Sequence, residues 1–272
     1  MTGPALPGPQ LPWPARRRPL SLVAFGNSVA SLVMPARVDR SEGTYLEVMA
    51  DVLAGEGVPS VVHQESRWFD FLHRAMRDYE TRVRSHAPDV VVVQFGLNEY
   101  QPWLLPIWVI RNLLVHNQAV TRTAKGYRRW VAPRLWRGVR GYRRRAAPLA
   151  GMRTWQTTPR RFEGHLRRLL RSLRVDGHPL VLVLDIDAPD SRLEHFLPGV
   201  AARHTVFQQL IERVVEQQED TSVRLVRVSE ITAAIGPTAL ADGMHYTPQT
   251  HRVVGEHLAD EVIQWMKERS LR

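Results

Sequence analysis

Three short stretches of the sequence hold residue types that together could transfer an acyl group. They contain Ser28, Asn98, and the pair Asp242 and His245. A serine hydroxyl attacks an acyl carbon efficiently when a histidine removes its proton, and a carboxylate can hold that histidine in the right tautomer. A side-chain amide can donate a hydrogen bond to the oxyanion that develops. These residue types therefore point to nucleophilic acyl transfer.

Each of these residues also has a structural explanation when it is considered alone. Ser28 could cap the helix that follows it, a position that serine favours. Asn98 could form an Asx turn, which is equally common. His251 is a second candidate base, but it falls inside a predicted helix and is interpreted as a packing or surface residue. The positions of the three stretches in the fold must decide between these interpretations.

Five apolar, β-branched runs predict the strands of a parallel sheet. Three of them are apolar almost throughout, as in strands that are covered on both faces. The five runs are residues 20–25, 58–63, 89–95, 179–186 and 223–228.

Segments with helical character alternate with the predicted strands. They are residues 41–57, 66–86, 160–175, 199–219 and 248–269. This alternation predicts an α/β protein, a three-layer α/β/α sandwich around a five-stranded parallel sheet. We expect a single domain over residues 20–270, preceded by a flexible, proline-rich leader, residues 1–19.

The candidate residues follow different strands of this predicted sheet. Ser28 comes after the first strand, Asn98 after the third, and the pair Asp242 and His245 comes between the fifth strand and the last helix. Ligands bind beyond the carboxyl ends of the strands in open α/β sheets. The four residues are therefore expected at the edge of the sheet where a substrate would bind.

This combination resembles the SGNH, or GDSL-type, hydrolase family over residues from about 20 to 268, apart from one insertion. Gly26-Asn27-Ser28 stands where the family has Gly-Asp-Ser, Gly96-Leu97-Asn98-Glu99 where it has Gly-x-Asn-Asp, and Asp242-Gly243-Met244-His245 matches its Asp-x-x-His block. The resemblance implies the flavodoxin-like fold of these hydrolases.

The resemblance also implies a role for each candidate residue. Ser28 would be the nucleophile, His245 the general base, and Asp242 the residue that orients the base. The backbone N–H of Ser28 and the side-chain amide of Asn98 would donate to the oxyanion. The reaction would pass through an acyl-enzyme and would require no cofactor and no metal.

The sequence departs from the family pattern after the second strand. The family has a glycine there whose N–H joins the oxyanion hole, whereas this chain reads VVHQESRWFDF without a glycine. The N–H of Ser66 or Arg67 is expected to take that place, and the side chains would narrow the pocket. Glu65 and Arg67 could instead contact a polar substrate, and Ser66 could simply cap a helix.

Other residues near these blocks are predicted to bind the substrate. Asn27 and Glu99 stand where the family has aspartates, and with Arg67 and Trp103 they form the predicted substrate-binding set.

Three aspartates end the fourth predicted strand, namely Asp185, Asp187 and Asp190. Carboxylates in such a group could bind Mg²⁺. The resemblance gives them no catalytic role, and loop capping is the favoured interpretation.

Residues 100–158 interrupt the alternation and are predicted to form a helical, basic insertion after the third strand. They hold twelve Lys and Arg, no Asp or Glu, and five of the eight tryptophans, whereas the rest of the chain carries 25 Lys and Arg against 27 Asp and Glu. The net charge of +10 therefore arises in the insertion. Because the segment follows Asn98 closely, we expect it at the mouth of the site.

Four roles fit the insertion. A lid over an apolar acyl pocket is favoured. Docking of an acidic carrier protein and contact with a membrane surface also fit its arginines and tryptophans. Nucleic-acid binding fits least, because the rest of the chain is acidic and carries no such motif.

Composition excludes several other classes of site. The chain has no cysteine, so disulfides, thiolate metal sites and cysteine nucleophiles are excluded. No apolar run reaches the ~20 residues that span a bilayer. The N-terminus lacks the apolar core of a signal peptide, so a cytoplasmic location is expected.

The sequence thus predicts a serine esterase or thioesterase that acts on a small-molecule or carrier-bound acyl substrate. Two alternatives stay open. The same triad could serve an acyltransferase, or the chain could be a non-catalytic protein with this fold that binds an anionic partner.

Overall fold

A five-stranded parallel sheet forms the centre of the molecule. The computed structural model describes residues 18–30, 43–67, 70–101, 157–189, 194, 199–241 and 243–270. Within them the strands are ordered β2-β1-β3-β4-β5. Their bounds are β1 Leu20–Gly26, β2 Ser60–Gln64, β3 Val90–Gln94, β4 Leu180–Leu184 and β5 Val223–Val226. The predicted five-stranded parallel sheet is confirmed.

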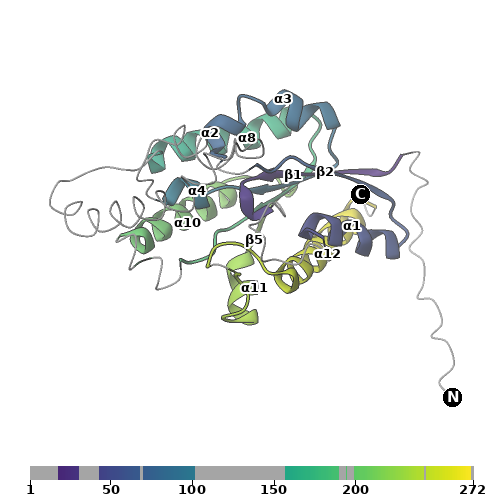
Figure 1. Cartoon of the computed structure of the whole chain (residues 1–272). Coiled ribbons are helices and arrows are strands. Elements are labelled where there is room, and N and C mark those ends of the chain that lie inside the picture. Colours follow the sequence, from purple (N-terminus) through teal and green to yellow (C-terminus); the bar gives the residue numbers. More distant parts are fainter. Residues whose placement is uncertain are drawn as a thin grey trace, which may run out of the picture.

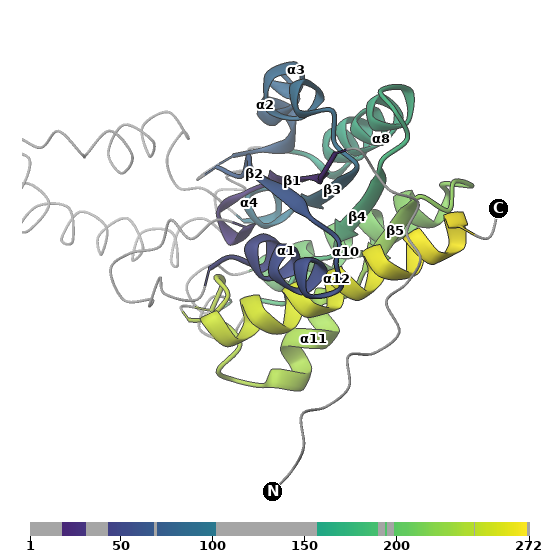
Figure 2. The same cartoon turned by 90° about the vertical axis from the view of Figure 1, so that its right-hand side faces the viewer.

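Helices cover both faces of this sheet. The α-helices are α1 Tyr45–Gly55, α2 Leu72–Ala75, α3 Tyr79–Arg82, α4 Leu97–Tyr100, α8 Pro159–Val175, α10 Val200–Glu216, α11 Val228–Ile235 and α12 Pro248–Ser270. Two short 3-10 helices are η1 Ser28–Ala30 and η2 Arg84–His86. Helices α1 and α12 pack together under one face with α11 beside α12, and α8 packs with α2 and α10 on the other (Figures 1 and 2). This is the predicted three-layer sandwich.

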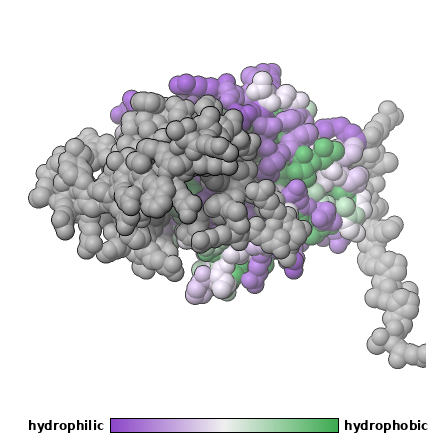
Figure 3. Space-filling view, viewed as in Figure 1, coloured by the Kyte–Doolittle hydropathy of each residue, from purple (hydrophilic) through white to green (hydrophobic). Residues whose placement is uncertain are grey.

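The core lies on both sides of the three central strands. Every residue of β1, β3 and β4 is buried, which agrees with their nearly continuous apolar sequences. Figure 3 shows hydrophilic and hydrophobic residues mixed over the described part of one face. Large hydrophobic side chains that are exposed are few among the described residues, namely Val61, Val175 and Val206.

Local signals fix the ends of several helices. Thr44 and Glu47 form a reciprocal capping box at the start of α1. Thr158 caps α8, and Pro159 occupies its first turn. These helices begin close to where the sequence predicts them.

The single helix predicted over residues 66–86 is wrong. Residues after β2 remain paired with β1, since Arg67 N–H donates to the Gly26 carbonyl at 3.1 Å. The chain then forms α2, α3 and η2 in succession. Helix α2 begins at Leu72, whose N–H donates to Glu99 Oε1 at 2.7 Å. A carboxylate from a distant segment therefore sets this helix start, which local sequence patterns do not reveal.

The ends of the basic insertion are held at one point of the fold. The Arg203 guanidinium on α10 donates to the backbone carbonyl of Glu99, just before the insertion, and to that of Thr157, near its end. The same guanidinium lies 4.9 Å from the ring centre of Phe207. Residues 102–156, including Trp103, lie outside the described residues, as does most of the predicted leader. No described helix has the length and apolar character needed to cross a membrane.

Candidate active site

Ser28 lies directly beyond the carboxyl end of β1. The Asn27 N–H extends the pairing of β1 with β3 by donating to the Gln94 carbonyl at 3.0 Å. The Asn27 side chain then accepts a hydrogen bond from Val29 N–H at 3.1 Å through Oδ1. Asn27 thus forms an Asx turn at the start of η1, the short helix that the sequence allowed Ser28 to cap.

Gly26 permits this close approach of β1 and β3. A Cβ atom on Gly26 would lie 2.7 Å from the Gln94 carbonyl oxygen and 3.3 Å from Ser66 Oγ. No ordinary side chain fits there without a backbone shift. The glycine before the candidate nucleophile is therefore required by packing.

The Ser28 hydroxyl contacts the imidazole of His245. Ser28 Oγ lies 3.0 Å from His245 Nε2, within hydrogen-bond distance. Ser28 is 8% exposed, so the hydroxyl lies near the surface without being freely solvated. A serine hydroxyl and an imidazole at this distance have the geometry that nucleophilic acyl transfer requires.

A tight loop between α11 and α12 holds His245. Ala241 N–H donates to the His245 carbonyl at 2.8 Å, and Thr247 N–H donates to the Ala239 carbonyl at 3.0 Å. Thr250 Oγ1 on α12 also donates to the Ala239 carbonyl at 2.6 Å. Asp242, the predicted orienting carboxylate, lies in this loop but outside the described residues.

A buried polar network anchors Tyr246, the residue after His245. Tyr45 on α1 donates to Gln94 Oε1 at 3.1 Å, and Gln94 Nε2 donates to the Tyr246 hydroxyl at 3.0 Å. Tyr246 is hydrogen-bonded in turn to Asp187. Burial is the main reason that the pKa of Tyr246 lies well above its usual value, so this hydroxyl stays neutral. The network ties the loop that carries His245 to β3 and α1.

His251 belongs to the same buried region but has a structural role. Its Nδ1 atom accepts a hydrogen bond from Tyr45 N–H at 3.2 Å, and the residue is 2% exposed. Burial, and secondarily the nearby His245, lower the pKa of His251 to about 4. It is a neutral packing histidine, as its place inside a predicted helix suggested.

Asn98 lies on α4, immediately beyond β3. Its N-cap, Gly96, has φ of 125°, and a Cβ atom there would lie 2.8 Å from Ile186 Cγ2. Asn98 is 3% exposed, and its Nδ2 atom donates to the Asp70 carbonyl at 2.8 Å. The nitrogen of a side-chain amide carries two hydrogens and can donate two hydrogen bonds.

Ser66 and Arg67 differ in their suitability as backbone oxyanion donors. The Arg67 N–H is committed to the Gly26 carbonyl at 3.1 Å. Ser66 lies beside Gly26, and its hydroxyl donates to the Ala24 carbonyl at 3.4 Å. Ser66 is therefore the better of the two candidates. The interpretation of Ser66 as a helix cap finds no support, because α2 begins six residues later.

Two of the predicted substrate-binding residues, Glu99 and Arg67, differ in burial and in their partners. The Glu99 carboxylate is 1% exposed and accepts hydrogen bonds from Leu72 N–H and Gly96 N–H, so its geometry is that of a structural cap. Burial raises the pKa of Glu99 to about 7, although these two N–H donors oppose the rise. The Arg67 side chain is 55% exposed and pairs with Asp78 at 3.3 Å.

A small cavity is lined in part by residues that neighbour Ser28 and His245 in the chain. Its lining includes Asn27, Val29, Gly243 and Met244, together with residues at and beyond the ends of β3 and β4. Its volume is about 10 Å³, enough for roughly one water molecule. The Asn27 Nδ2 atom is buried without a hydrogen-bond partner among the described residues. Asn27 thus remains a candidate for contact with a bound molecule.

The aspartates after β4 are satisfied by protein groups. Asp185 accepts from Ser229 N–H at 2.9 Å and from Gln208 Nε2 at 2.8 Å, and Asp187 accepts from Thr232 Oγ1 at 2.5 Å. Burial raises the pKa of Asp187 to about 6. Among the described residues no group of three or more His, Cys, Asp or Glu could hold a metal ion. These contacts agree with the capping interpretation; Asp190 lies outside the described residues.

Comparison with known proteins places this arrangement in a structural class. No protein-family model and no curated protein matches the sequence. A lipase/acylhydrolase from Enterococcus faecalis has a similar structure, with a TM-score of 0.58, 14% identity, and coverage of 89% of this chain and 95% of that one.

Two further solved structures have the same architecture. The psychrotrophic esterase EstA from Pseudoalteromonas sp., in a form inhibited by monoethylphosphonate, gives a TM-score of 0.55 at 12% identity and covers 91% of this chain and 98% of that one. A protein from Desulfitobacterium hafniense, described as lipolytic and of the G-D-S-L family, gives 0.55 at 9% identity, with 88% and 98% covered. The chain therefore has the fold of the GDSL-type, or SGNH, hydrolases.

Proposed function

We propose that this protein is a serine hydrolase that cleaves an ester or thioester through an acyl intermediate on Ser28. The observation that carries the proposal is the 3.0 Å contact between Ser28 Oγ and His245 Nε2. The two groups come from opposite ends of the chain and meet beyond the carboxyl end of β1, where ligands of α/β sheets bind. The fold shared with esterases and lipases supports the same chemistry.

The mechanism follows from this contact. His245 Nε2 takes the proton from Ser28 Oγ as that oxygen forms a bond to the acyl carbon. The alcohol or thiol then leaves with the proton from Nε2, and the acyl group stays on Ser28. Water, activated by the same nitrogen, releases the acid and restores the hydroxyl. Asp242 would hold the protonated imidazole in place.

The oxyanion of each tetrahedral intermediate needs donors that are already in position. The backbone N–H groups of Ser28 and Ser66 and the Asn98 amide are the proposed set. Burial of Asn98 supports its inclusion, because a hydrogen bond in a site shielded from water stabilises developing charge more strongly than one in water.

We propose further that the insertion covers the acyl group of the substrate as a lid. Its two ends are held together by Arg203 close to α4, which carries Asn98. Replacing residues 102–156 by a short linker should raise KM for long-chain esters more than for acetyl esters. Equal effects on both would count against the lid.

The proposal is tested with p-nitrophenyl esters of several chain lengths, one acyl thioester, and a fluorophosphonate probe. Wild-type protein should label at one serine and turn over at least one acyl donor, whereas Ser28→Ala should do neither. Ser270→Ala, at the far end of α12, is the matched control and should retain both activities. Product analysis with an added alcohol separates hydrolysis from acyl transfer. A wild-type protein that neither labels nor turns over any donor refutes the proposal.

A further inference from the structure

Among the described residues, Arg82 on α3 is the largest fully buried side chain, and it carries a positive charge. It is 2% exposed, and its guanidinium lies 4.9 Å from the ring centre of Phe25 in β1. Burying a guanidinium is costly unless carboxylates and hydrogen bonds compensate for it. Its partners therefore show what the fold gains from placing a charge there.

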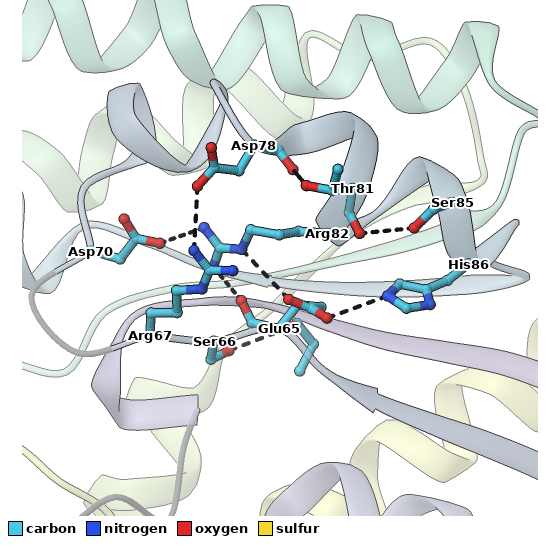
Figure 4. Close-up of polar contacts among 10 residues, drawn as sticks. Glu65, Ser66, Arg67, Asp70, Asp78, Thr81, Arg82, Ser85 and His86 are labelled. Carbon is cyan, nitrogen blue, oxygen red and sulfur yellow. Dashed lines mark hydrogen bonds and ion pairs between the residues drawn. The ribbon is translucent and has the colours of Figure 1, made fainter.

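One of these partners is the peptide group that precedes Ser66. An Arg82 guanidinium N–H donates to the Glu65 carbonyl (Figure 4). This carbonyl and the Ser66 N–H belong to the same planar trans peptide and point in opposite directions. By holding the carbonyl on the α3 side, Arg82 directs the Ser66 N–H to the other side. A hydrogen bond to the carbonyl also polarises the peptide and strengthens its N–H as a donor.

The second partner is Asp70, which contacts the other proposed donor. Arg82 Nη1 lies 2.6 Å from Asp70 Oδ2 (Figure 4). The Asp70 backbone carbonyl accepts the hydrogen bond from Asn98 Nδ2 at 2.8 Å. Arg82 thus fixes the residue that orients the Asn98 amide.

The charges around Arg82 indicate that it acts through these groups and not by direct attraction of an oxyanion. Its guanidinium lies between Asp70 and Glu65, with its Nε atom 3.6 Å from Glu65 Oε2. Two carboxylates against one guanidinium leave the cluster with no excess positive charge. Arg82 therefore contributes to the site by holding the groups that it contacts in place.

We propose that Arg82 is the positioning residue of the oxyanion hole, holding the Ser66 N–H through the Glu65 carbonyl and the Asn98 amide through Asp70. The proposal rests on the proposed hydrolase function. It explains how a chain without the family's glycine after the second strand can still present a backbone donor there: the peptide is held by an arginine from a neighbouring helix.

The experiment compares Arg82→Gln and Arg82→Lys with Arg84→Gln. Arg84 is the matched control, because its side chain is 55% exposed and pairs with Glu80 and Asp176 at the surface. With a p-nitrophenyl ester, Arg82→Gln should lower kcat by roughly 10- to 100-fold. The donors stabilise the oxyanion, which develops only in the transition state, so misdirecting them weakens binding of the transition state and not of the ester. KM should change by less than about threefold. The kcat of Arg82→Lys should lie between those of wild type and Arg82→Gln, and the kcat of Arg84→Gln should match that of wild type.

A double-mutant cycle separates positioning from general destabilisation. The loss of kcat in Arg82→Gln combined with Asn98→Ala should be smaller than the product of the single losses, because part of the effect of Arg82 passes through the Asn98 amide. Losses that multiply, or an unchanged kcat in folded Arg82→Gln, overturn the proposal. If Arg82→Gln does not fold, Asp70→Asn replaces it, since that change weakens the ion pair and keeps the backbone carbonyl that Asn98 contacts.

A readout without turnover distinguishes failure of this proposal from failure of the hydrolase function. The Ser66 backbone amide and the Asn98 side-chain amide should both shift in ¹⁵N–¹H spectra of Arg82→Gln, and neither should shift in Arg84→Gln. Unmoved signals overturn the positioning role even if the protein hydrolyses esters. Shifted signals in a protein without esterase activity would retain the positioning role and refute only the hydrolase.

Discussion

The Ser28 hydroxyl and the Nε2 atom of His245 lie 3.0 Å apart, although 217 positions separate the two residues in the chain. Ser28 is placed by the end of β1 and His245 by the loop before α12. Separate segments of the fold therefore place the two residues, and no short stretch of sequence contains both. A contact of this kind, beyond the carboxyl end of a central strand, is difficult to explain as packing alone.

The first prediction concerns the base. His245→Gln should lower kcat/KM for the best ester by at least about 10³-fold, because the serine would lose the group that takes its proton. His251→Gln is the control, since that imidazole contacts Tyr45 N–H and not Ser28. It should keep most of the activity at pH 8. Steady-state kinetics and fluorophosphonate labelling measure both variants, and similar losses in the two would contradict the assignment of the base.

The second prediction concerns the proposed oxyanion donor Asn98. Asn98→Ala should lower kcat by roughly 10²- to 10³-fold, the usual cost of removing one such donor. Because Asn98 also holds the Asp70 carbonyl, thermal unfolding must be measured alongside. A loss of stability with unchanged kcat would show that the amide serves only the fold.

The residues of the site could be identified from the sequence because each follows a strand of a recognisable α/β pattern. The apolar run before Ser28 and the run of valines before Asn98 are strong strand signals, and parallel strands bring their carboxyl ends to one edge. The fold class followed from that pattern, and the pairing of Ser28 with His245 was implied by the resemblance to the SGNH hydrolases. Asp242 and Trp103 lie outside the described residues, so their roles stay predictions.

The residues that support the site could not be identified in this way. Arg82 looks like one more charged residue in a polar helix, and only the structure places it against Glu65 and Asp70. The sequence predicts Glu99 as a substrate contact because it replaces a family aspartate, yet its carboxylate is buried as the cap of α2. Both depend on contacts between segments distant in sequence, which composition and periodicity do not record.

The third prediction concerns this buried carboxylate. At pH 8, above the raised pKa of about 7, both oxygens of Glu99 accept backbone hydrogen bonds. Glu99→Gln would turn an NH₂ group toward Leu72 N–H or Gly96 N–H and leave one of these donors unpaired. The free energy of unfolding should fall by ~1–3 kcal/mol in urea titrations. Glu230→Gln, on the exposed side of α11, should leave stability nearly unchanged. Equal stability of Glu99→Gln and wild type would contradict the capping role.

The fourth prediction is a pH dependence of stability that arises from His251. Burial lowers its pKa in the folded protein to about 4, from the ordinary value of 6.5. Above pH 6.5 the imidazole is neutral in both states, and its contribution to stability is fully present. As the pH falls from 6.5 toward 4, the unfolded chain binds a proton that the folded protein refuses. Stability on the order of 3 kcal/mol is lost over that window.

His251→Gln isolates this contribution, because a glutamine oxygen can accept the hydrogen bond from Tyr45 N–H without titrating. Other buried groups also titrate in acid, so the comparison is between slopes and not between absolute stabilities. Between pH 6.5 and 4.5, the free energy of unfolding should fall less steeply with pH in His251→Gln than in wild type. The slope is proportional to the number of protons taken up on unfolding, and this number should be smaller by up to one in the variant. His257→Gln, an exposed position on the same helix, should keep the wild-type slope. Parallel curves for wild type and His251→Gln would mean that the folded protein accepts the proton, and the buried, neutral state of this histidine would then be wrong.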